Sequence, residues 1–339
     1  MLNVAKFITC ACLAGLVLTA GGSGLAAEQA RKTSAVLPVP NAKPERALKS
    51  YTGDLRYHTT VYEDTLLKIA RANNLGYVEI RAANPGIDPW LPGEDQDVLL
   101  PTRHLLPVAP RQGIVVNLPE MRLYHFRDAG KDPVTYPIGI GRTGLKTPIG
   151  TTKIIKKKEK PNWFPTDRMR EEDPALPRMV GPGPDNPLGT HALYLGWPTF
   201  LIHGTSEPWG IGRRVSSGCI RLYPEDIVKL YQRASTDTPV TIVDQPVKAG
   251  WIKDRFYIEA HVSQKYANQV EETGDQPPFD ISRQDLDMIL EQAGDKAHIV
   301  DWYKVRQILT QRQGYPIAVT PAIGETRQAA QNNTGKNPT

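Results

Sequence analysis

Residues 200–222 read FLIHGTSEPWGIGRRVSSGCIRL, and they place a histidine and a cysteine within one short segment. His203 ends an apolar run, whereas Cys219 directly follows Gly218. A cysteine attacks as its thiolate, and because its ordinary pKa is ~8.5 it needs an imidazole or a positive charge nearby to react at neutral pH. The segment therefore predicts an acyl-transfer site in which Cys219 is the nucleophile and His203 takes the thiol proton.

Two further features of the segment favour this chemistry. Gly218 lets backbone N–H groups come close to a reacting carbonyl oxygen, as an oxyanion hole requires. Arg221 or Arg214 can stabilise the thiolate by its charge. The spacing alone is explained about equally well by a core histidine and a buried, inert cysteine, so the compartment in which the protein works becomes informative.

The first 27 residues predict export. Lys6 precedes an apolar run from Phe7 to Thr19, and small residues follow as far as Ala27. This is the layout of a secretory signal peptide cleaved near Ala27. An uncleaved anchor is the alternative, but the apolar run is shorter than the roughly 20 residues that a spanning helix needs. We expect a periplasmic protein with no integral membrane segment after cleavage.

Export would leave the chain with one cysteine. Cys10 and Cys12 lie in the predicted signal peptide, so Cys219 remains of the three. Outside the cytoplasm thiols tend to be oxidised, and an unpaired one is either a small buried hydrophobe or is kept for its chemistry. The Gly, Ser and Arg neighbours of Cys219 favour the second interpretation.

Composition favours a globular, β-rich protein. The 339 residues are 40% hydrophobic and 23% charged, with 28 Gly and 30 Pro, which argues against a helical bundle or a coiled coil. A chain of this length can form more than one core. The formal charge of +5 neither requires nor excludes an anionic partner.

Residues 51–104 predict a small α+β module. Tyr57–Val61 has the pattern of a strand, and Leu66–Ala70 that of a helix with an N-cap just before it. Val78–Pro85 predicts a second short helix that proline ends, and Val98–Pro101 a second strand. The order strand, helix, helix, strand is that of a compact module with its own core.

This module resembles a LysM domain, the small peptidoglycan-binding module. The motifs that carry the resemblance are Asp64-Thr65-Leu66, Asn84-Pro85, Leu91-Pro92-Gly93 and Val98-Leu99-Leu100-Pro101. The resemblance implies a contact with peptidoglycan. A packing domain without a ligand of its own is the alternative, because fold does not determine function.

The following segment predicts strands interrupted by one long insertion. Pro119-Glu120 lies between two apolar runs and indicates a hairpin. The insertion between Lys156 and Gly189 is rich in proline, glycine and charge, as lids and substrate walls are, and its Trp163 and Phe164 either line a substrate or anchor the loop. The basic run Lys156–Lys160 predicts a solvated face. No histidine pair shows a zinc spacing.

The segment resembles the YkuD family of L,D-transpeptidase catalytic domains. The motifs are His203-Gly204-Thr205, Gly210-Ile211-Gly212 and Ser216–Arg221, with Pro137–Gly141 and Gly183–Gly189 before them. The resemblance implies a mixed α+β, mainly β, sandwich-like domain that acts on peptidoglycan stem peptides.

The resemblance also implies a mechanism without metal or cofactor. Cys219 attacks the carbonyl between diaminopimelate and the terminal D-alanine of a tetrapeptide stem, and a thioester forms as D-alanine leaves. His203 acts as base and then acid, oriented by a backbone carbonyl at Gly204, and the amides of Ser217, Gly218 and Cys219 are candidates for the oxyanion hole. An amine of another stem then gives a 3→3 cross-link.

Other acceptors and other functions remain open. An outer-membrane protein or lipoprotein could supply the amine, and water would make the protein an L,D-carboxypeptidase. A non-catalytic peptidoglycan-binding protein is the alternative from another class. We expect no nucleic-acid partner. Arg221, Tyr194 and Trp209 are the candidates for substrate binding.

The chain is thus divided into six segments. They are a signal peptide (1–27), a linker (28–50), a LysM-like module (51–104), an L,D-transpeptidase catalytic domain (111–245), a C-terminal, partly helical extension (246–322) and a disordered tail (323–339).

Overall fold

The computed structural model describes residues 49–128, 130–274 and 280–321. The predicted signal peptide 1–27, nearly all of the linker 28–50 and the predicted tail 323–339 lie outside the described residues. Within the described part of the chain, every helix is too short or too polar to cross a bilayer.

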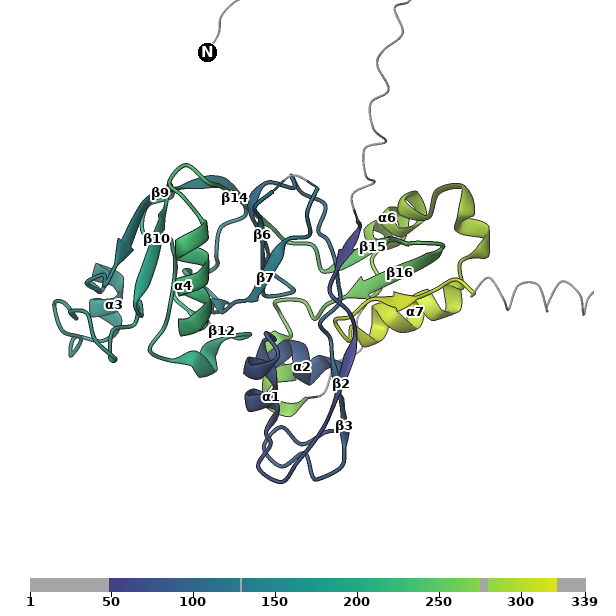
Figure 1. Cartoon of the computed structure of the whole chain (residues 1–339), viewed down its shortest axis with the longest axis horizontal. Helices are drawn as coiled ribbons and strands as arrows, with labels where there is room; N and C mark the ends of the chain where they lie inside the picture. Colours follow the sequence, from purple (N-terminus) through teal and green to yellow (C-terminus); the bar gives the residue numbers. More distant parts are fainter. Residues whose placement is uncertain (1–48, 129, 275–279, 322–339) are drawn as a thin grey trace, which may run out of the picture. The chain divides into compact units, whose positions relative to one another are not determined.

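An eight-stranded sheet forms the centre of the catalytic segment (Figure 1). Its strands are β5 (Gly113–Asn117), β6 (Arg122–Phe126), β7 (Val134–Pro137), β9 (Gly150–Glu159), β10 (His191–Leu195), β11 (Leu201–His203), β13 (Ile220–Arg221) and β14 (Pro239–Val243). The spatial order is β13-β11-β10-β9-β14-β5-β6-β7. The predicted hairpin is confirmed, because β5 and β6 pair antiparallel around Pro119-Glu120. A two-stranded sheet of β8 (Ile140–Gly141) and β12 (Arg214–Ser216) lies beside it.

Strand β5 is covered on both faces. In β5, Ile114 and Val116 belong to the main core, whereas Val115 packs with Tyr124 and Phe126 in a separate cluster. Side chains alternate between the faces of a strand, so the two clusters lie on opposite sides of the sheet. The continuous apolar run that predicted this strand therefore marks a strand buried on both faces. The mainly β expectation is confirmed.

Helix α4 (Pro224–Arg233) packs against β10. It begins with proline in its first turn, followed by Glu225 and Asp226, as the sequence predicts. Ile227 and Leu230 turn into the main core. At its other end the ammonium of Lys157 donates to the carbonyls of Tyr231 and Ala234 at 2.6 Å each. Part of the basic run thus caps a helix.

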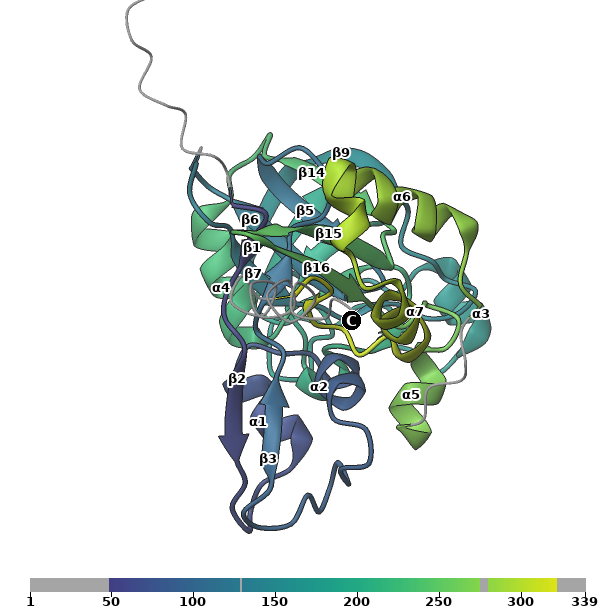
Figure 2. The same ribbon diagram turned by 90° about the vertical axis from the view of Figure 1, so that its right-hand side faces the viewer.

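The N-terminal module has the predicted order of elements. Strand β2 (Arg56–Thr59) pairs antiparallel with β3 (Asp97–Leu100), and helices α1 (Leu66–Ala72) and α2 (Tyr77–Ala83) lie between them in the chain. Figure 2 shows these four elements together. Their own core consists of Leu66, Ile69, Ala70, Leu75, Ile80, Val98 and Leu100. A short pair, β1 (Tyr51–Thr52) with β4 (His104–Leu105), flanks the module.

The C-terminal extension contains a sheet as well as the predicted helices. Its elements are β15 (Val247–Ile252), β16 (Arg255–Ala260), α5 (Ala267–Thr273), α6 (Arg283–Ala293), the 3₁₀ helix η2 (Gly294–Ile299), α7 (Trp302–Gln311) and β17 (Ile317–Ala318). β16 lies between β15 and β17, and α6 and α7 pack on this sheet (Figure 2). Phe256, Ile258, Ile289, Val305 and Leu309 are among the residues of a separate core.

Candidate active site

The register of two parallel strands brings the predicted histidine and cysteine to one face. In β11 and β13, Ile202 is opposite Ile220 and His203 is opposite Arg221. Ile202 and Ile220 are buried in the core. Because side chains alternate along a strand, His203, Arg221 and also Cys219, which directly precedes β13, point to the opposite face.

That face forms the wall of a cavity of about 250 Å³. Among the residues predicted to act here, Cys219, His203, Ser217, Arg221 and Tyr194 line the cavity. Trp163 and Phe164, from the long insertion, line it too. The insertion carries a short helix, α3 (Asp167–Glu172), and a bridge between Trp163 and Val180. The segment therefore supplies one wall of the cavity.

The imidazole of His203 is fixed by the next residue. Its Nδ1–H donates to the carbonyl oxygen of Gly204 at 2.6 Å, which leaves Nε2 as the proton acceptor. The side chain is buried, and burial together with the charge of Arg221 lowers the pKa of His203 to about 3. Neutral imidazole is thus the resting form at physiological pH.

The thiol of Cys219 is also neutral at rest. Burial raises its pKa, and this effect outweighs the opposing ones of the Leu201 N–H and of Arg221. The sulfur lies 3.4 Å from the carbonyl oxygen of Thr199. As predicted, the charge of Arg221 lowers the pKa of Cys219, but this effect is too small to make the thiolate the resting form. A nucleophilic attack by this thiol would therefore require proton transfer to a base.

The turn before Cys219 is held by two hydroxyl groups. Ser216 Oγ accepts from the Gly218 N–H at 3.2 Å and donates to the Cys219 carbonyl at 2.5 Å, while Thr147 Oγ1 donates to the Gly218 carbonyl at 2.8 Å. Gly218 has φ +107°, and a Cβ there would lie 2.9 Å from the Phe200 ring. Only glycine fits this position.

Arg221 lines the cavity and has an unsatisfied buried donor. Its Nε is buried and has no hydrogen-bond partner among the described residues. Burial lowers the pKa of Arg221, which nevertheless stays charged. Trp209 is placed differently: it lies in a 3₁₀ helix, η1 (Pro208–Gly210), is 53% exposed and does not line the cavity. Its role in substrate binding stays a prediction.

A second cluster of ionisable side chains lies away from this cavity. Within the part of the chain that the structure describes, His104, Glu120 and Glu259 have donor atoms close enough together to hold a metal ion. The ammonium of Lys248 already lies 2.9 Å from a carboxylate oxygen of each glutamate. His261 Nε2 lies 2.7 Å from Glu259. The carboxylates are thus neutralised by protein cations. Sequence spacing could not reveal this set, because Glu120, in the turn between β5 and β6, is far along the chain from the β15–β16 hairpin that carries Lys248 and Glu259.

A cavity that holds a cysteine, a buried neutral histidine and a glycine turn is suited to a cysteine acyltransferase. Comparison with known proteins agrees: residues 111–242 match the family model of the L,D-transpeptidase catalytic domain, YkuD. The chain is 36% identical over 251 residues to "Probable L,D-transpeptidase ErfK/SrfK" of Salmonella typhimurium, across 72% of this chain and 79% of that protein. This protein therefore belongs to the L,D-transpeptidase family.

Two relatives from Escherichia coli strain K12 are similar over a shorter length. "Probable L,D-transpeptidase YcfS" is 41% identical across 58% of this chain and 64% of its own length. "Probable L,D-transpeptidase YbiS" is 44% identical across 55% of this chain and 63% of its own length. The chain thus matches slightly less than two thirds of these two relatives.

Proposed function

We propose that this protein is an exported peptidoglycan L,D-transpeptidase that acts through a cysteine acyl-enzyme on tetrapeptide stems. The observation that carries the proposal is the placement of Cys219 and His203 on one face of adjacent parallel strands, in one cavity with Arg221. Its membership of the family supports the reaction class.

The first half-reaction forms a thioester. The sulfur of Cys219 attacks the carbonyl carbon between diaminopimelate and the terminal D-alanine, and the thiol proton passes to His203 Nε2. The carbon–nitrogen bond then breaks, and the imidazolium gives its proton to the departing amine of D-alanine. The Gly204 carbonyl, which accepts from Nδ1–H, favours the imidazolium while the proton is held. Cys219 and His203 are both neutral before the substrate binds. This suits the cycle, because the thiolate and the imidazolium then form only during the reaction.

Backbone amides beside Cys219 stabilise the tetrahedral intermediate. The Gly218 N–H donates to Ser216 Oγ in this structure. The amides of Ser217 and Cys219 are therefore the better candidates for the oxyanion hole, with Gly218 holding the turn.

Arg221 binds a carboxylate of the stem peptide. Its guanidinium lines the cavity with an unsatisfied buried donor, and guanidinium groups pair with carboxylates. Tyr194, which also lines the cavity, contacts the peptide from the neighbouring strand. Trp209 lies outside the cavity and would contact only a substrate that extends beyond it.

The second half-reaction is resolved by the group that reaches the thioester. An amine of a second stem gives a 3→3 cross-link, an amine of an envelope protein attaches that protein to the wall, and water gives hydrolysis as in an L,D-carboxypeptidase. Of these acceptors we favour the amines over water, because the family is named for transfer.

The N-terminal module supplies a contact to the glycan strands. Tyr62 is 82% exposed and Trp90 58% exposed. Their loops are adjacent, since the Leu66 N–H donates to the Pro89 carbonyl and Thr60 Oγ1 to the Gly93 carbonyl. Exposed aromatic rings on neighbouring loops offer apolar faces to sugar rings, which favours the LysM interpretation over a module that only packs.

Incubation with purified disaccharide-tetrapeptide fragments tests the reaction. The native chain should release D-alanine, and Cys219→Ala should release none, while His203→Gln, which lacks the base, should be slowed by at least a hundredfold. Mass spectrometry of the remaining peptide then separates dimers from hydrolysed tripeptide. Equal release by the native chain and Cys219→Ala would rule out Cys219 as the nucleophile, and no release by the native chain would leave the non-catalytic peptidoglycan-binding alternative.

A further inference from the structure

The segment that joins His203 to Cys219 is held by the N-terminal module. The amide of Tyr77 donates to the Ile211 carbonyl at 3.3 Å, and the amide of Val78 donates to the Gly212 carbonyl at 3.2 Å. Both amides belong to the first turn of α2, where a helix has N–H groups without internal partners. The carbonyls of Ile211 and Gly212 accept hydrogen bonds from these two amides. We call the segment between His203 and Cys219, residues 204–218, the catalytic loop.

Two glycines permit this close approach. A Cβ on Gly212 would lie 2.1 Å from the Tyr77 nitrogen, and a Cβ on Gly76 would lie 2.7 Å from Gly212 Cα. Gly212 also has φ +75°, a conformation that residues with a Cβ rarely adopt. The backbone of the module and that of the loop are therefore in direct contact.

The catalytic loop connects the contact with α2 to Cys219, the proposed nucleophile. Gly212 leads directly into β12, and Ser216 at the end of β12 supplies the hydroxyl that holds the Gly218–Cys219 turn. Between them, the Arg213 guanidinium stacks on the Tyr77 ring at 4.1 Å and pairs with Glu271 of α5 at 2.6 Å. Only three residues lie between Gly212, which contacts α2, and Ser216, whose side chain fixes the turn.

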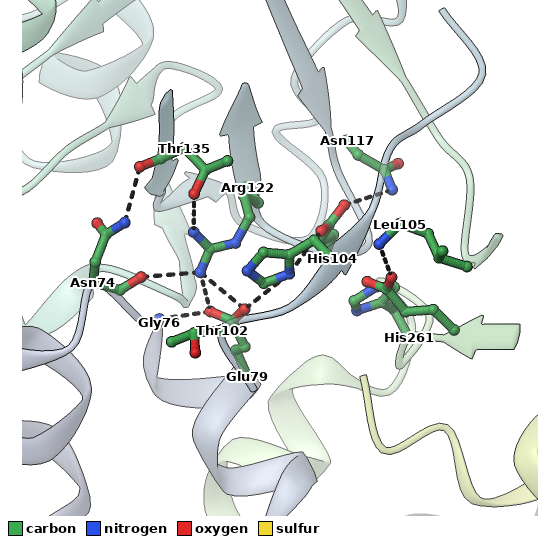
Figure 3. Close-up of polar contacts among 12 residues, drawn as sticks. Asn74, Gly76, Glu79, Thr102, His104, Leu105, Asn117, Arg122, Thr135 and His261 are labelled. Atoms are coloured by element: carbon green, nitrogen blue, oxygen red, sulfur yellow. Dashed lines mark hydrogen bonds and ion pairs between the residues drawn. The ribbon is translucent and has the colours of Figure 1, made fainter. Parts of the chain in front are cut away.

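A buried ion pair fixes α2 on the catalytic sheet. Glu79 accepts from the Gly76 N–H at 2.9 Å, and its carboxylate lies 2.7 Å from the Arg122 guanidinium of β6 (Figure 3). Arg122 also donates to the Asn74 carbonyl and to Thr135 Oγ1, both at 3.0 Å. Both charged side chains are buried. The first turn of α2 is thus held against the catalytic sheet by a buried ion pair and by hydrogen bonds.

We propose that the first turn of α2 positions the catalytic loop, with Gly212 and the Tyr77 amide as positioning residues for Cys219. The N-terminal module is then a structural part of the active site in addition to any ligand it binds. This inference rests on the proposed function, in which Cys219 is the nucleophile.

Acylation of Cys219 by a carbapenem β-lactam, followed by mass spectrometry of the full chain, tests the proposal. Gly212→Ala should lower the acylation rate at saturating carbapenem by at least tenfold, with the half-saturation concentration within threefold of native. Gly86→Ala is the matched control, because Gly86 has φ +86° and a Cβ there meets nothing within 4 Å. It carries the same backbone strain without a clash and should keep the native rate. Equal rates for the two variants would overturn the proposal.

A second pair of variants serves if Gly212→Ala does not fold. Tyr77→Pro removes the N–H that donates to the Ile211 carbonyl. Proline is well tolerated at the first position of a helix after an extended residue such as Gly76 (ψ 159°). Tyr77→Ala removes the same ring but keeps the amide. Tyr77→Pro should be at least fivefold slower than Tyr77→Ala, and identical rates would contradict the positioning role.

Alkylation with iodoacetamide separates failure of this inference from failure of the proposed function. If the native chain is neither acylated nor releases D-alanine, the proposed function fails. The pH dependence of alkylation at Cys219 still compares Gly212→Ala with Gly86→Ala. A profile displaced only in Gly212→Ala supports the positioning role, whereas coincident profiles overturn it.

Discussion

His203 and Arg221 lie opposite each other in the parallel register of β11 and β13, with both side chains on the cavity face. A permanent positive charge beside a buried imidazole opposes its protonation. The base of the proposed reaction is thereby kept free of a proton over the whole physiological range, and the same guanidinium remains available to a substrate carboxylate.

The acylation rate should therefore be insensitive to mild acid. Since burial and Arg221 lower the pKa of His203 to about 3, the imidazole stays neutral between pH 5 and pH 7. We expect the carbapenem acylation rate of the native chain to change by less than about twofold over this interval. A tenfold fall centred near ~6.5, the ordinary histidine pKa, would contradict this arrangement.

Arg221→Gln should move the acid limb of that profile to higher pH. Without the neighbouring cation the pKa of His203 rises, because one of the two effects that lower it is gone. Arg221→Lys keeps a charge at this position and should keep the limb at the native pH. Both variants should bind a stem peptide less tightly, since lysine cannot form the bidentate contact. The rate profile and the peptide affinity are measured separately.

Burial of His203 also predicts a pH dependence of stability. Its folded pKa of about 3 lies below the unfolded value of ~6.5, so only the unfolded chain takes up this proton between those two values. Stability from this group is complete above pH 6.5 and is lost as pH falls, at roughly 1.4 kcal/mol per pH unit. His125, whose pKa burial lowers to about 4, adds a similar loss.

Equilibrium urea unfolding between pH 4.5 and pH 7 measures this effect. His203→Gln should show a shallower loss of unfolding free energy with falling pH than the native chain, by about one proton. His298→Gln, on the exposed η2 helix, should keep the native slope. Parallel curves for all three chains would show that His203 takes up its proton in the folded state.

The candidate pair, Cys219 and His203, could be proposed from sequence because its signal is local. His203 and Cys219 share one segment, and glycine beside a cysteine indicates a tight turn whatever surrounds it. The sequence predicts that Arg221 favours the thiolate, and its charge does lower the pKa of Cys219, but burial raises that pKa by more. A sequence shows which charges lie near Cys219 in the chain, but it does not show how far the folded protein excludes water from the site.

The elements that sequence patterns missed depend on distant pairing. The hairpin of β15 and β16 lies in a segment predicted only as a partly helical extension, and its third strand, β17, comes from near the end of the described chain. Lys248 and Glu259 are opposite each other in the β15–β16 hairpin, whereas Glu120 lies in the turn between β5 and β6 and meets them only in the folded protein. In contrast, α6 and α7 carry their own N-caps, Ser282 and Asp301, so their starts depend on local sequence.

Removing the buried ammonium of Lys248 should strongly destabilise the fold. Burial raises the pKa of Glu120, yet Lys248 and His104 outweigh it and hold that pKa well below its usual range. Lys248→Met leaves two buried carboxylates without their shared cation, a change expected to cost ~3–5 kcal/mol in unfolding free energy. Lys131→Met removes a cation from an exposed pair with Asp128 and should leave the urea midpoint unchanged. Similar midpoints for both variants would mean that the network contributes no net stability.

The exposed rings of the N-terminal module predict a measurable affinity for cell-wall glycan. Trp90→Ala removes the largest exposed ring from the surface that it shares with Tyr62, so pull-down on purified, insoluble peptidoglycan should show at least a fivefold weaker retention. Tyr303→Ala is the control, because Tyr303 is 74% exposed but lies on α7 in the C-terminal extension. Stacking on sugar rings depends little on salt, so the loss should persist at high ionic strength. Equal weakening by the two variants would show that any exposed ring promotes adsorption and would favour a module that only packs.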